Sequence, residues 1–346
     1  MQPSSNRSFP RRRFLHGTAA TAATLAAGFD PWAMGADSAP EAAPAPPPSR
    51  PLGRTGMRLP RLAYGGTALP RRWGNPLSYD RRIALVRHAH ARGLRYFDTA
   101  GNYMESQDIL GRALEDLRQE VFLTTKIETT DPARVRPAVE RCLSQLRTDH
   151  ADALLIHGTP GLQQMSVAQA MRVHSELRKL REEKLCRFIG FSAHGYFDKA
   201  LALIRTGGFD LCMLAYGYIP RGYDQLHSPR MQALRDACLA EARARGMGIV
   251  AMKVIGAGLL GAWARKVVPD FPPHQARRLP AAAIRWVLQD DRVDLLCIGM
   301  RTPEEIDANL RVLHADPGLS AADREVLADY CAQAYETEAL KRLRLE

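Results

Sequence analysis

The chain has 346 residues, of which 46% are apolar and 25% are charged, a composition typical of a globular protein with a large buried core. Its net charge of +11 is spread along the chain, with basic residues often beside acidic ones. Because no long basic run follows residue 13, the sequence argues against a nucleic-acid-binding surface.

The first 36 residues have the order of an export signal: a basic region, an apolar region and a small-residue cleavage site. The segment Arg11-Arg12-Arg13-Phe14-Leu15 resembles a twin-arginine signal. We therefore expect the twin-arginine export machinery as a partner and the periplasm as the location. The apolar region is too short and too polar to be a stable membrane anchor. A disordered basic tail is the alternative interpretation.

Residues 37–50 (DSAPEAAPAPPPSR) are rich in Pro and Ala, which favours an extended linker. We expect one folded domain over residues 51–346. Six cysteines, none in a CxxC pair, predict buried thiols rather than a zinc site or a small disulfide framework. Export would allow some of them to be oxidised.

From residue 60 onward, short apolar runs alternate with longer amphipathic stretches. Runs that are apolar throughout are typical of parallel strands, which are buried on both faces. The predicted strands cover residues 61–64, 96–99, 121–126, 153–157, 188–192, 211–216, 248–253 and 295–299.

Helical spacing of apolar residues marks the intervening segments, for example residues 132–146 and 167–183. Eight strand–helix units in roughly 250 residues favour a single (β/α)8 TIM barrel. A doubly wound sheet often shows GxGxxG after its first strand, whereas this chain has Gly65-Gly66-Thr67-Ala68. Residues 320–346 predict one additional C-terminal helix.

Ionisable residues follow three successive strands. Asp98 ends the second strand, Lys126 ends the third and His157 ends the fourth, with Tyr103 in the loop after Asp98. Taken singly, each has a plain structural interpretation, such as a helix cap, a solvated lysine or a core histidine. Because strand ends converge at one mouth of a barrel, their coincidence instead predicts a shared site.

The chemistry of these groups suits the reduction of a carbonyl. A carbonyl that accepts hydride becomes an alkoxide and needs a proton donor, for which Tyr103 is the candidate. We expect Lys126 to lower the tyrosine pKa and Asp98 to hold Lys126 in place. His157 would hydrogen bond the substrate oxygen.

These positions belong to an ordered series of motifs. The series comprises Leu52-Gly53-Arg54-Thr55-Gly56, Phe97-Asp98-Thr99-Ala100, Gly101-Asn102-Tyr103, Thr125-Lys126, Leu155-Ile156-His157, Gly190-Phe191-Ser192 and residues 253–261 and 298–309. From about Pro51 to Leu313 the chain resembles the aldo/keto reductases. The resemblance implies an NAD(P)H-dependent oxidoreductase that reduces an aldehyde or ketone to an alcohol. Tyr103 would be its general acid.

The resemblance also implies an extended nicotinamide dinucleotide bound without a Rossmann fold. Ser192 would contact its carboxamide, and Tyr216 would stack on the nicotinamide ring. A turn after the seventh strand would present backbone N–H groups to the pyrophosphate, although an ordinary flexible loop is the alternative. The implied residues of this turn are Lys253, Gly256, Gly258 and Leu259. Those implied around the adenosine end are Arg301, Thr302, Glu305 and Asn309.

Some positions depart from the family pattern. Ala193 stands where Asn is common, and Met213 where Gln is frequent. Glu305 replaces an Arg that would bind a 2′-phosphate, and a carboxylate suits a ribose diol instead. We expect NADP(H) by family habit, with NAD(H) open. Cys331 is alone near the C-terminus, so we expect no iron–sulfur cluster.

The substrate is weakly specified. Loop residues either line a substrate pocket or pack the loops onto the barrel rim. They are Trp73, Tyr218, Arg221, Tyr223, His227 and Trp263. Arg221 hints at an anionic substrate. We expect no metal site, since His88 and His90 would face different directions on a helix.

One rival function remains open, and a second is disfavoured. A non-catalytic sensor on the same barrel would bind the nicotinamide cofactor but turn over very slowly. A sugar isomerase or hydrolase would need metal ligands or paired carboxylates at the strand ends, which the sequence lacks.

Overall fold

The computed structural model describes residues 46–344. The expected export signal and most of the linker lie outside these residues. Residues 46–344 form one compact unit.

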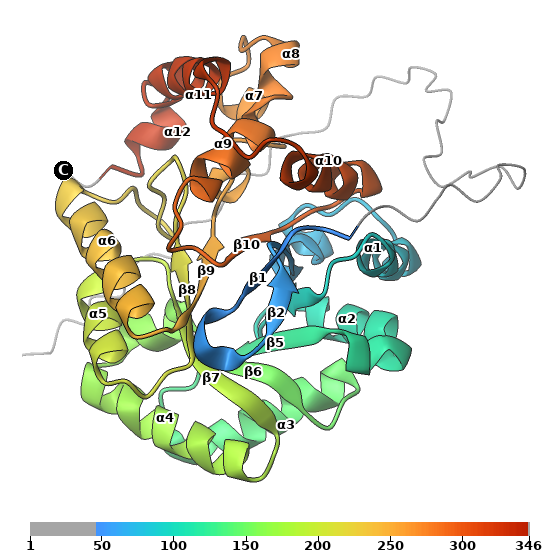
Figure 1. Cartoon of the computed structure of the whole chain (residues 1–346), viewed down its shortest axis with the longest axis vertical. Coiled ribbons are helices and arrows are strands. Elements are labelled where there is room, and N and C mark those ends of the chain that lie inside the picture. Colours follow the sequence, from blue (N-terminus) through green and yellow to red (C-terminus); the bar gives the residue numbers. More distant parts are fainter. Residues whose placement is uncertain (1–45, 345–346) are drawn as a thin grey trace, which may run out of the picture. The chain divides into compact units, whose positions relative to one another are not determined.

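Within residues 46–344, eight parallel strands close into a barrel, in chain order, with the last strand pairing to the first (Figure 1). The strands are β3 (Leu62–Gly65), β4 (Tyr96–Asp98), β5 (Phe122–Ile127), β6 (Ala151–Ile156), β7 (Cys186–Ala193), β8 (Leu211–Ala215), β9 (Gly248–Met252) and β10 (Leu295–Ile298). All eight predicted strands overlap these, which confirms the (β/α)8 barrel. Most of their residues are buried, as strands covered on both faces require.

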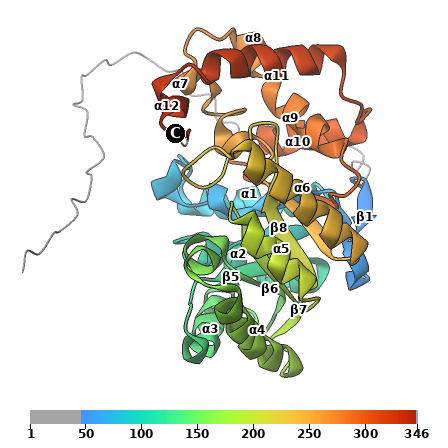
Figure 2. The ribbon, with the colours of Figure 1, turned by 90° about the vertical axis from the view of Figure 1, so that its left-hand side faces the viewer.

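One principal helix follows each strand and lies outside the barrel (Figures 1 and 2). These helices are α1 (Tyr79–Ala91), α2 (Ser106–Leu114), α3 (Val135–Leu146), α4 (Val167–Glu182), α5 (Phe197–Arg205), α6 (Pro229–Ala244), α9 (Leu279–Leu288) and α10 (Pro303–His314). The connection between β9 and α9 also contains α7 (Ala264–Val267) and α8 (Pro273–Ala276).

Local sequence explains where the helices begin. Ser166 caps α4, and its side chain and that of Gln169 form a reciprocal capping box. Asp131 caps a single 3-10 turn, Pro132–Arg134, which leads into α3. The predicted apolar face of α4, which includes Val173 and Leu177, is buried against the barrel.

A short antiparallel hairpin precedes the barrel. Its strands are β1 (Ser49–Pro51) and β2 (Arg58–Pro60), and it begins two residues inside the segment predicted as a linker. Leu52 and Leu59 are buried in one apolar cluster with side chains of the barrel strands. The hairpin therefore covers the end of the barrel at which the strands begin.

The C-terminal segment forms two helices, α11 (Ala321–Ala334) and α12 (Glu338–Lys341), instead of the single predicted helix. Thr337 accepts a hydrogen bond from the N–H of Leu340, which starts the second helix.

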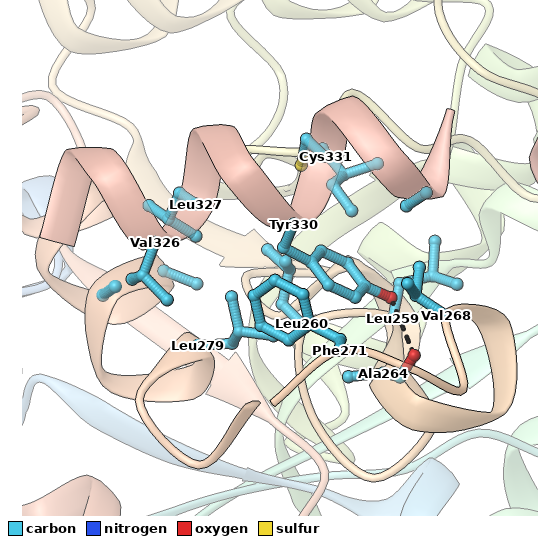
Figure 3. Packing of buried hydrophobic residues seen from close by; sticks show 14 of the residues in the cluster. Leu259, Leu260, Ala264, Val268, Phe271, Leu279, Val326, Leu327, Tyr330 and Cys331 are labelled. Atoms are coloured by element: carbon cyan, nitrogen blue, oxygen red, sulfur yellow. Dashed lines mark hydrogen bonds between the residues drawn. The ribbon is translucent and has the colours of Figure 1, made fainter. Parts of the chain in front are cut away.

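Helix α11 packs on the connection between β9 and α9. Tyr330 stands over Phe271, with ring centroids 5.1 Å apart, and its hydroxyl donates to the carbonyl of Ala264 at 3.3 Å (Figure 3). Leu259 and Leu260, from the loop after β9, belong to the same buried cluster. Helix α11 thus supports a loop that borders the mouth of the barrel.

None of the helices in the described part of the chain is both long enough and apolar enough to cross a membrane.

Candidate active site

The predicted tetrad meets at the end of the barrel where the strands terminate. Asp98 is the last residue of β4, and Lys126 lies near the end of β5. His157 directly follows β6, and Tyr103 lies in the loop after β4. Asp98 pairs with Thr124 in the strand register, and Lys126 comes two residues after Thr124 on the same side of β5. Lys126 therefore lies closer than Asp98 to the mouth of the barrel.

Asp98 and Lys126 form a buried ion pair. The Lys126 ammonium donates to both Asp98 oxygens, at 2.6 and 2.7 Å, and to the carbonyl of Thr99 at 2.8 Å. Burial raises the pKa of Asp98, while the nearby Lys126 charge acts against this rise. The ammonium also lies 4.9 Å from the centre of the Tyr103 ring.

The Tyr103 hydroxyl lies 3.5 Å from Nε2 of His157. Burial raises the pKa of Tyr103 well above its usual value of 10, and the Asp98 charge adds to the rise. The expectation that Lys126 lowers this pKa is therefore wrong. The Asp98 carboxylate neutralises the ammonium, so desolvation of the phenol dominates. Tyr103 is a protonated phenol at neutral pH, which suits a proton donor.

Glu128 is a site residue that the sequence analysis missed. Its Oε1 lies 3.3 Å from Nδ1 of His157 and accepts the N–H of Asn102 at 3.1 Å. It follows Lys126 by two residues, so strand alternation could have placed both side chains on one side of β5. The carboxylate, the imidazole and the Tyr103 phenol thus form a continuous row.

A cavity of about 1150 Å³ opens beside this row. It extends from Asp98, Tyr103 and His157 at one end to the first turns of α10 at the other. The predicted residues that line it are Asp98, Tyr103, His157, Trp73, Tyr223, Lys253, Gly258, Trp263, Arg301, Glu305 and Asn309. Lys126 lies behind this surface, with 1% of its area exposed.

The model of the aldo/keto reductase family matches residues 61–323, more than half of the chain. The chain belongs to the aldo/keto reductase family. Membership implies NAD(P)H-dependent oxidoreduction of a carbonyl group.

Among curated proteins, the chain is 24% identical to L-galactose dehydrogenase of Arabidopsis thaliana over 308 residues, covering 81% of this chain and 92% of that protein. It is 27% identical to a (1S)-1,7-diacetoxy-luvungin A aldo-keto reductase of Citrus sinensis over 270 residues, covering 70% of this chain and 78% of that protein. Among solved structures, the holo form of an aldo-keto reductase from Bacillus halodurans has a TM-score of 0.64. The two chains share 18% identity over 82% of this chain and 96% of that one, a likeness of fold.

In this aldo/keto reductase, Tyr216 lies outside the cavity in which we expected it to stack on a nicotinamide ring. Its hydroxyl donates to Asp290 at 2.7 Å, and its ring packs against Trp286. Met213 faces the cavity, and side chains alternate along a strand, so Tyr216, three positions later, points outward. Within the described residues, the cavity wall at the ends of β8 and β9 is formed by Met213 and Met252 instead.

Ser192 is fully buried and lies outside the cavity lining. Its Oγ accepts the N–H of Gly158 at 2.8 Å, which ties β7 to the loop after β6. His194 lines the cavity, and its Nδ1 has no hydrogen-bond partner in the part of the chain that the structure describes.

The turn after β9 does not present all the backbone N–H groups that we expected to bind a pyrophosphate. The N–H groups of Gly256, Gly258 and Leu259 donate to carbonyls within the turn, at 2.8, 3.1 and 3.4 Å. Gly258 and Ala257 line the cavity, whereas Gly256 and Leu259 do not. The turn needs residues with positive φ, and Gly258, at 93°, is the most extreme of them.

Lys253 is the cation of this turn. Its side chain lines the cavity and has no ion-pair or hydrogen-bond partner within residues 46–344. Burial lowers the pKa of Lys253 to about 8, and the nearby Arg221 charge contributes. Arg221 lies behind the lining, and its buried Nε also lacks a partner among the described residues. These uncompensated cations suit a ligand that brings an anionic group.

The far end of the cavity is built on the start of α10. Thr302 caps this helix by accepting the N–H of Glu305 at 3.2 Å, so its hydroxyl faces the helix rather than the cavity. Glu305 in turn accepts the N–H of Arg301 at 2.6 Å. The Arg301 guanidinium donates to the carbonyl of Trp73 at 3.1 Å and so joins this end to the loop after β3.

Aromatic side chains surround the mouth. Trp73, Tyr223 and Trp263 line the cavity and are 37%, 59% and 37% exposed. The Trp73 ring meets the Tyr103 ring edge-on, with centroids 5.4 Å apart. Tyr218, in contrast, packs against Trp286 outside the cavity.

Metal ligands are not clustered in the described part of the chain: no three His, Cys, Asp or Glu side chains there are placed to hold a metal ion. The six cysteine thiols are free and buried.

Proposed function

We propose that this protein reduces an aldehyde or ketone to an alcohol, with Tyr103 as the general acid. The observation that carries the proposal is the position of the Tyr103 hydroxyl. Tyr103 lines the cavity, its hydroxyl lies 3.5 Å from His157, and its ring lies beside the buried Asp98–Lys126 pair.

Each residue of the tetrad has a separate role in the proposed carbonyl reduction. A bound nicotinamide supplies the hydride. Tyr103 carries a proton at neutral pH because burial raises its pKa, so it can donate that proton to the developing alkoxide. The Asp98–Lys126 pair lies next to the Tyr103 ring, 4.9 Å from its centre, and supports the phenol in place without lowering its pKa. His157 lies beside the Tyr103 hydroxyl, where it can orient the substrate oxygen.

The cavity fits an extended dinucleotide. It spans the distance between the tetrad and α10, and the unpaired Lys253 lies along it, where it would meet a pyrophosphate. We propose NADP(H) by the habit of the family, with NAD(H) as the alternative. The Glu305 carboxylate favours NAD(H), because it can accept hydrogen bonds from a ribose diol and repels a 2′-phosphate.

We also propose export to the periplasm through the twin-arginine route. The support is the Arg11-Arg12-Arg13-Phe14-Leu15 segment followed by an apolar region and a small-residue site. Replacing Arg11 and Arg12 by Lys should retain the protein in the cytoplasm, which fractionation followed by immunoblotting would show.

The test of the enzymatic proposal uses residues 37–346 with a panel of aldehydes, ketones and quinones. We expect oxidation of NADPH or NADH, and a fall in kcat of about 10²- to 10⁴-fold in Tyr103→Phe. Calorimetry should give the same cofactor affinity for both proteins. Tight cofactor binding without turnover on any substrate would contradict the proposal and support a sensor. Turnover that survives in Tyr103→Phe would remove Tyr103 from its role.

A further inference from the structure

Glu128 is the carboxylate that contacts His157 in the row of proton-carrying groups. It lies one residue beyond β5, and its Oε1 contacts two different parts of the site. One contact is with Nδ1 of His157 at 3.3 Å, and the other is with the N–H of Asn102 at 3.1 Å. The His157 side chain is 3% exposed and that of Glu128 is 28% exposed.

We infer that Glu128 is a positioning residue that fixes the tautomer of His157 and stabilises its protonated form, which makes Glu128, His157 and Tyr103 a linked triad. The inference rests on the proposed carbonyl reduction for its kinetic consequence, and on the geometry alone for the tautomer.

The tautomer follows from what a carboxylate can do. An ionised carboxylate only accepts hydrogen bonds, so the Nδ1 that faces Glu128 must carry a proton. In the neutral imidazole, Nε2 is then the unprotonated nitrogen, and it can accept the Tyr103 O–H at 3.5 Å. In the imidazolium both nitrogens donate, to Glu128 and toward Tyr103.

The groups around His157 act in opposite directions. The pKa of His157 lies below its usual value of 6.5, because burial lowers it and the charge of Lys126 lowers it further. His194 stands on another side, with ring centroids 6.5 Å apart, and burial lowers its pKa well below 6.5, so it is an uncharged neighbour at neutral pH. Glu128 raises the pKa of His157, through its hydrogen bond and its charge. Without Glu128, a protonated and buried His157 would face the Lys126 charge with no carboxylate in contact with it.

This arrangement gives Tyr103 a source of protons. During reduction, hydride forms a C–H bond at the carbonyl carbon, and the Tyr103 proton forms the alcohol O–H bond. The phenolate left behind is strongly basic, because the pKa of Tyr103 is raised, and it takes a proton from Nε2 of His157 when the imidazole is protonated. His157 thereby returns to the neutral Nδ1–H form. A proton from solvent then restores the imidazolium. Each cycle consumes one hydride and one solvent proton, as carbonyl reduction requires.

The second contact of Glu128, with the N–H of Asn102, helps to position Tyr103. Asn102 precedes Tyr103, so the hydrogen bond to its N–H holds the loop that carries the phenol. One carboxylate therefore fixes both the imidazole and the tyrosine loop. This is the role that a carboxylate has in other histidine-based proton-transfer sites.

The test compares full-length wild type, Glu128→Gln and Glu128→Asp, with Glu140→Gln as control. Glu140 lies on the exposed face of α3, 3.6 Å from Arg136, and its replacement removes the same charge away from the site. Imidazole ¹⁵N NMR of uniformly labelled protein, with His157 assigned from a His157→Gln spectrum, would report the tautomer and the pKa. Rates of carbonyl reduction would be measured against pH in parallel.

We expect wild-type His157 to show the Nδ1–H form. Glu128→Gln should lower its pKa by about one unit, while Glu128→Asp retains part of the effect and Glu140→Gln none. In wild type, kcat should fall with rising pH as His157 loses its proton. In Glu128→Gln this fall should occur at a lower pH, displaced by as much as the His157 pKa. An unchanged His157 pKa in Glu128→Gln, or an Nε2–H form in wild type, would overturn the inference. If no carbonyl is reduced, the NMR result still decides the role of Glu128, so failure of the proposed function is seen separately.

Discussion

The Lys126 ammonium donates hydrogen bonds to both carboxylate oxygens of Asp98 at a depth where 1% and 3% of the two residues are exposed. A buried pair of this kind becomes strongly destabilising when one partner is removed, because the other charge stays uncompensated. Asp98→Asn should therefore lower the free energy of unfolding by about 3–5 kcal/mol, as measured by urea denaturation.

The double variant Asp98→Asn/Lys126→Met removes both charges and provides the control. Its stability should lie well above that expected from adding the two single changes. Simple additivity would show that the pair contributes no coupling. Activity should be lost in all three variants, since Lys126 lies 4.9 Å from the Tyr103 ring centre.

Lys253 offers a prediction about pH. Its pKa of about 8 is below the ordinary value of 10.5 for lysine, so the folded state binds fewer protons than the unfolded state between these pH values. Stability of the ligand-free protein should thus rise as pH increases from about 8 to 10.5. Lys253→Met should remove that rise and should be more stable than wild type at pH 7.

The same variant should bind the dinucleotide more weakly at pH 7, by roughly tenfold, because it lacks the cation that faces the cavity. In wild type, affinity should decline as pH rises through 8, whereas in Lys253→Met it should be flat over this range. Fluorescence titration at several pH values measures both. An equal pH dependence in the two proteins would place the titrating group elsewhere.

Glu305 governs the choice of cofactor in our interpretation. Glu305→Gln keeps an oxygen that can accept the Arg301 N–H but removes the negative charge from the cavity wall. The ratio of kcat/KM for NADPH to that for NADH should rise by about tenfold. Glu304→Gln, at a neighbouring position of the same wall, is the matched comparison. If the NADPH/NADH ratio changed equally in the two variants, the cause would be the overall negative charge of the cavity wall and not a direct contact of Glu305 with the cofactor.

Helix α11 should influence cofactor binding without touching the cofactor. Leu327 is fully buried in the cluster that contains Leu259, next to the cavity-lining Gly258 (Figure 3). Leu327→Ala should destabilise the protein by about 2–5 kcal/mol and raise the KM for the dinucleotide more than it lowers kcat. Glu325→Ala, on the exposed side of the same helix, should change neither quantity.

The barrel could be predicted from the sequence because its strands are buried on both faces. Runs such as residues 211–216 and 295–299 are therefore apolar throughout, and their spacing reveals the repeated strand–helix unit. The C-terminal helix was predicted too long because helical periodicity continues past Ala334. Thr337 offers a cap for a new helix, and a local competition of that kind is not visible in periodicity alone.

The site was predicted in part. Residues at strand ends could be placed because the fold dictates where they meet. Tyr216 could not, because an all-apolar strand does not reveal in its sequence which alternate side chains face the cavity. Gly256, Leu259, Thr302 and Ser192 have the expected residue types, yet their polar groups or side chains are engaged within the protein. Such competition depends on coordinates, not on composition.

The β1–β2 hairpin sets the limit for shortening the protein. Pro47, two residues before β1, is already buried, and Gly93 has no room for a side chain because Pro47 lies against it. A tag or fusion partner joined ahead of Pro47 leaves all of these contacts in place. A chain that starts after Pro51 lacks β1 and uncovers Leu59 together with the apolar floor of the barrel. Exposed apolar surface of that kind promotes aggregation, so such a truncated protein would come out of solution although its entire catalytic tetrad is present.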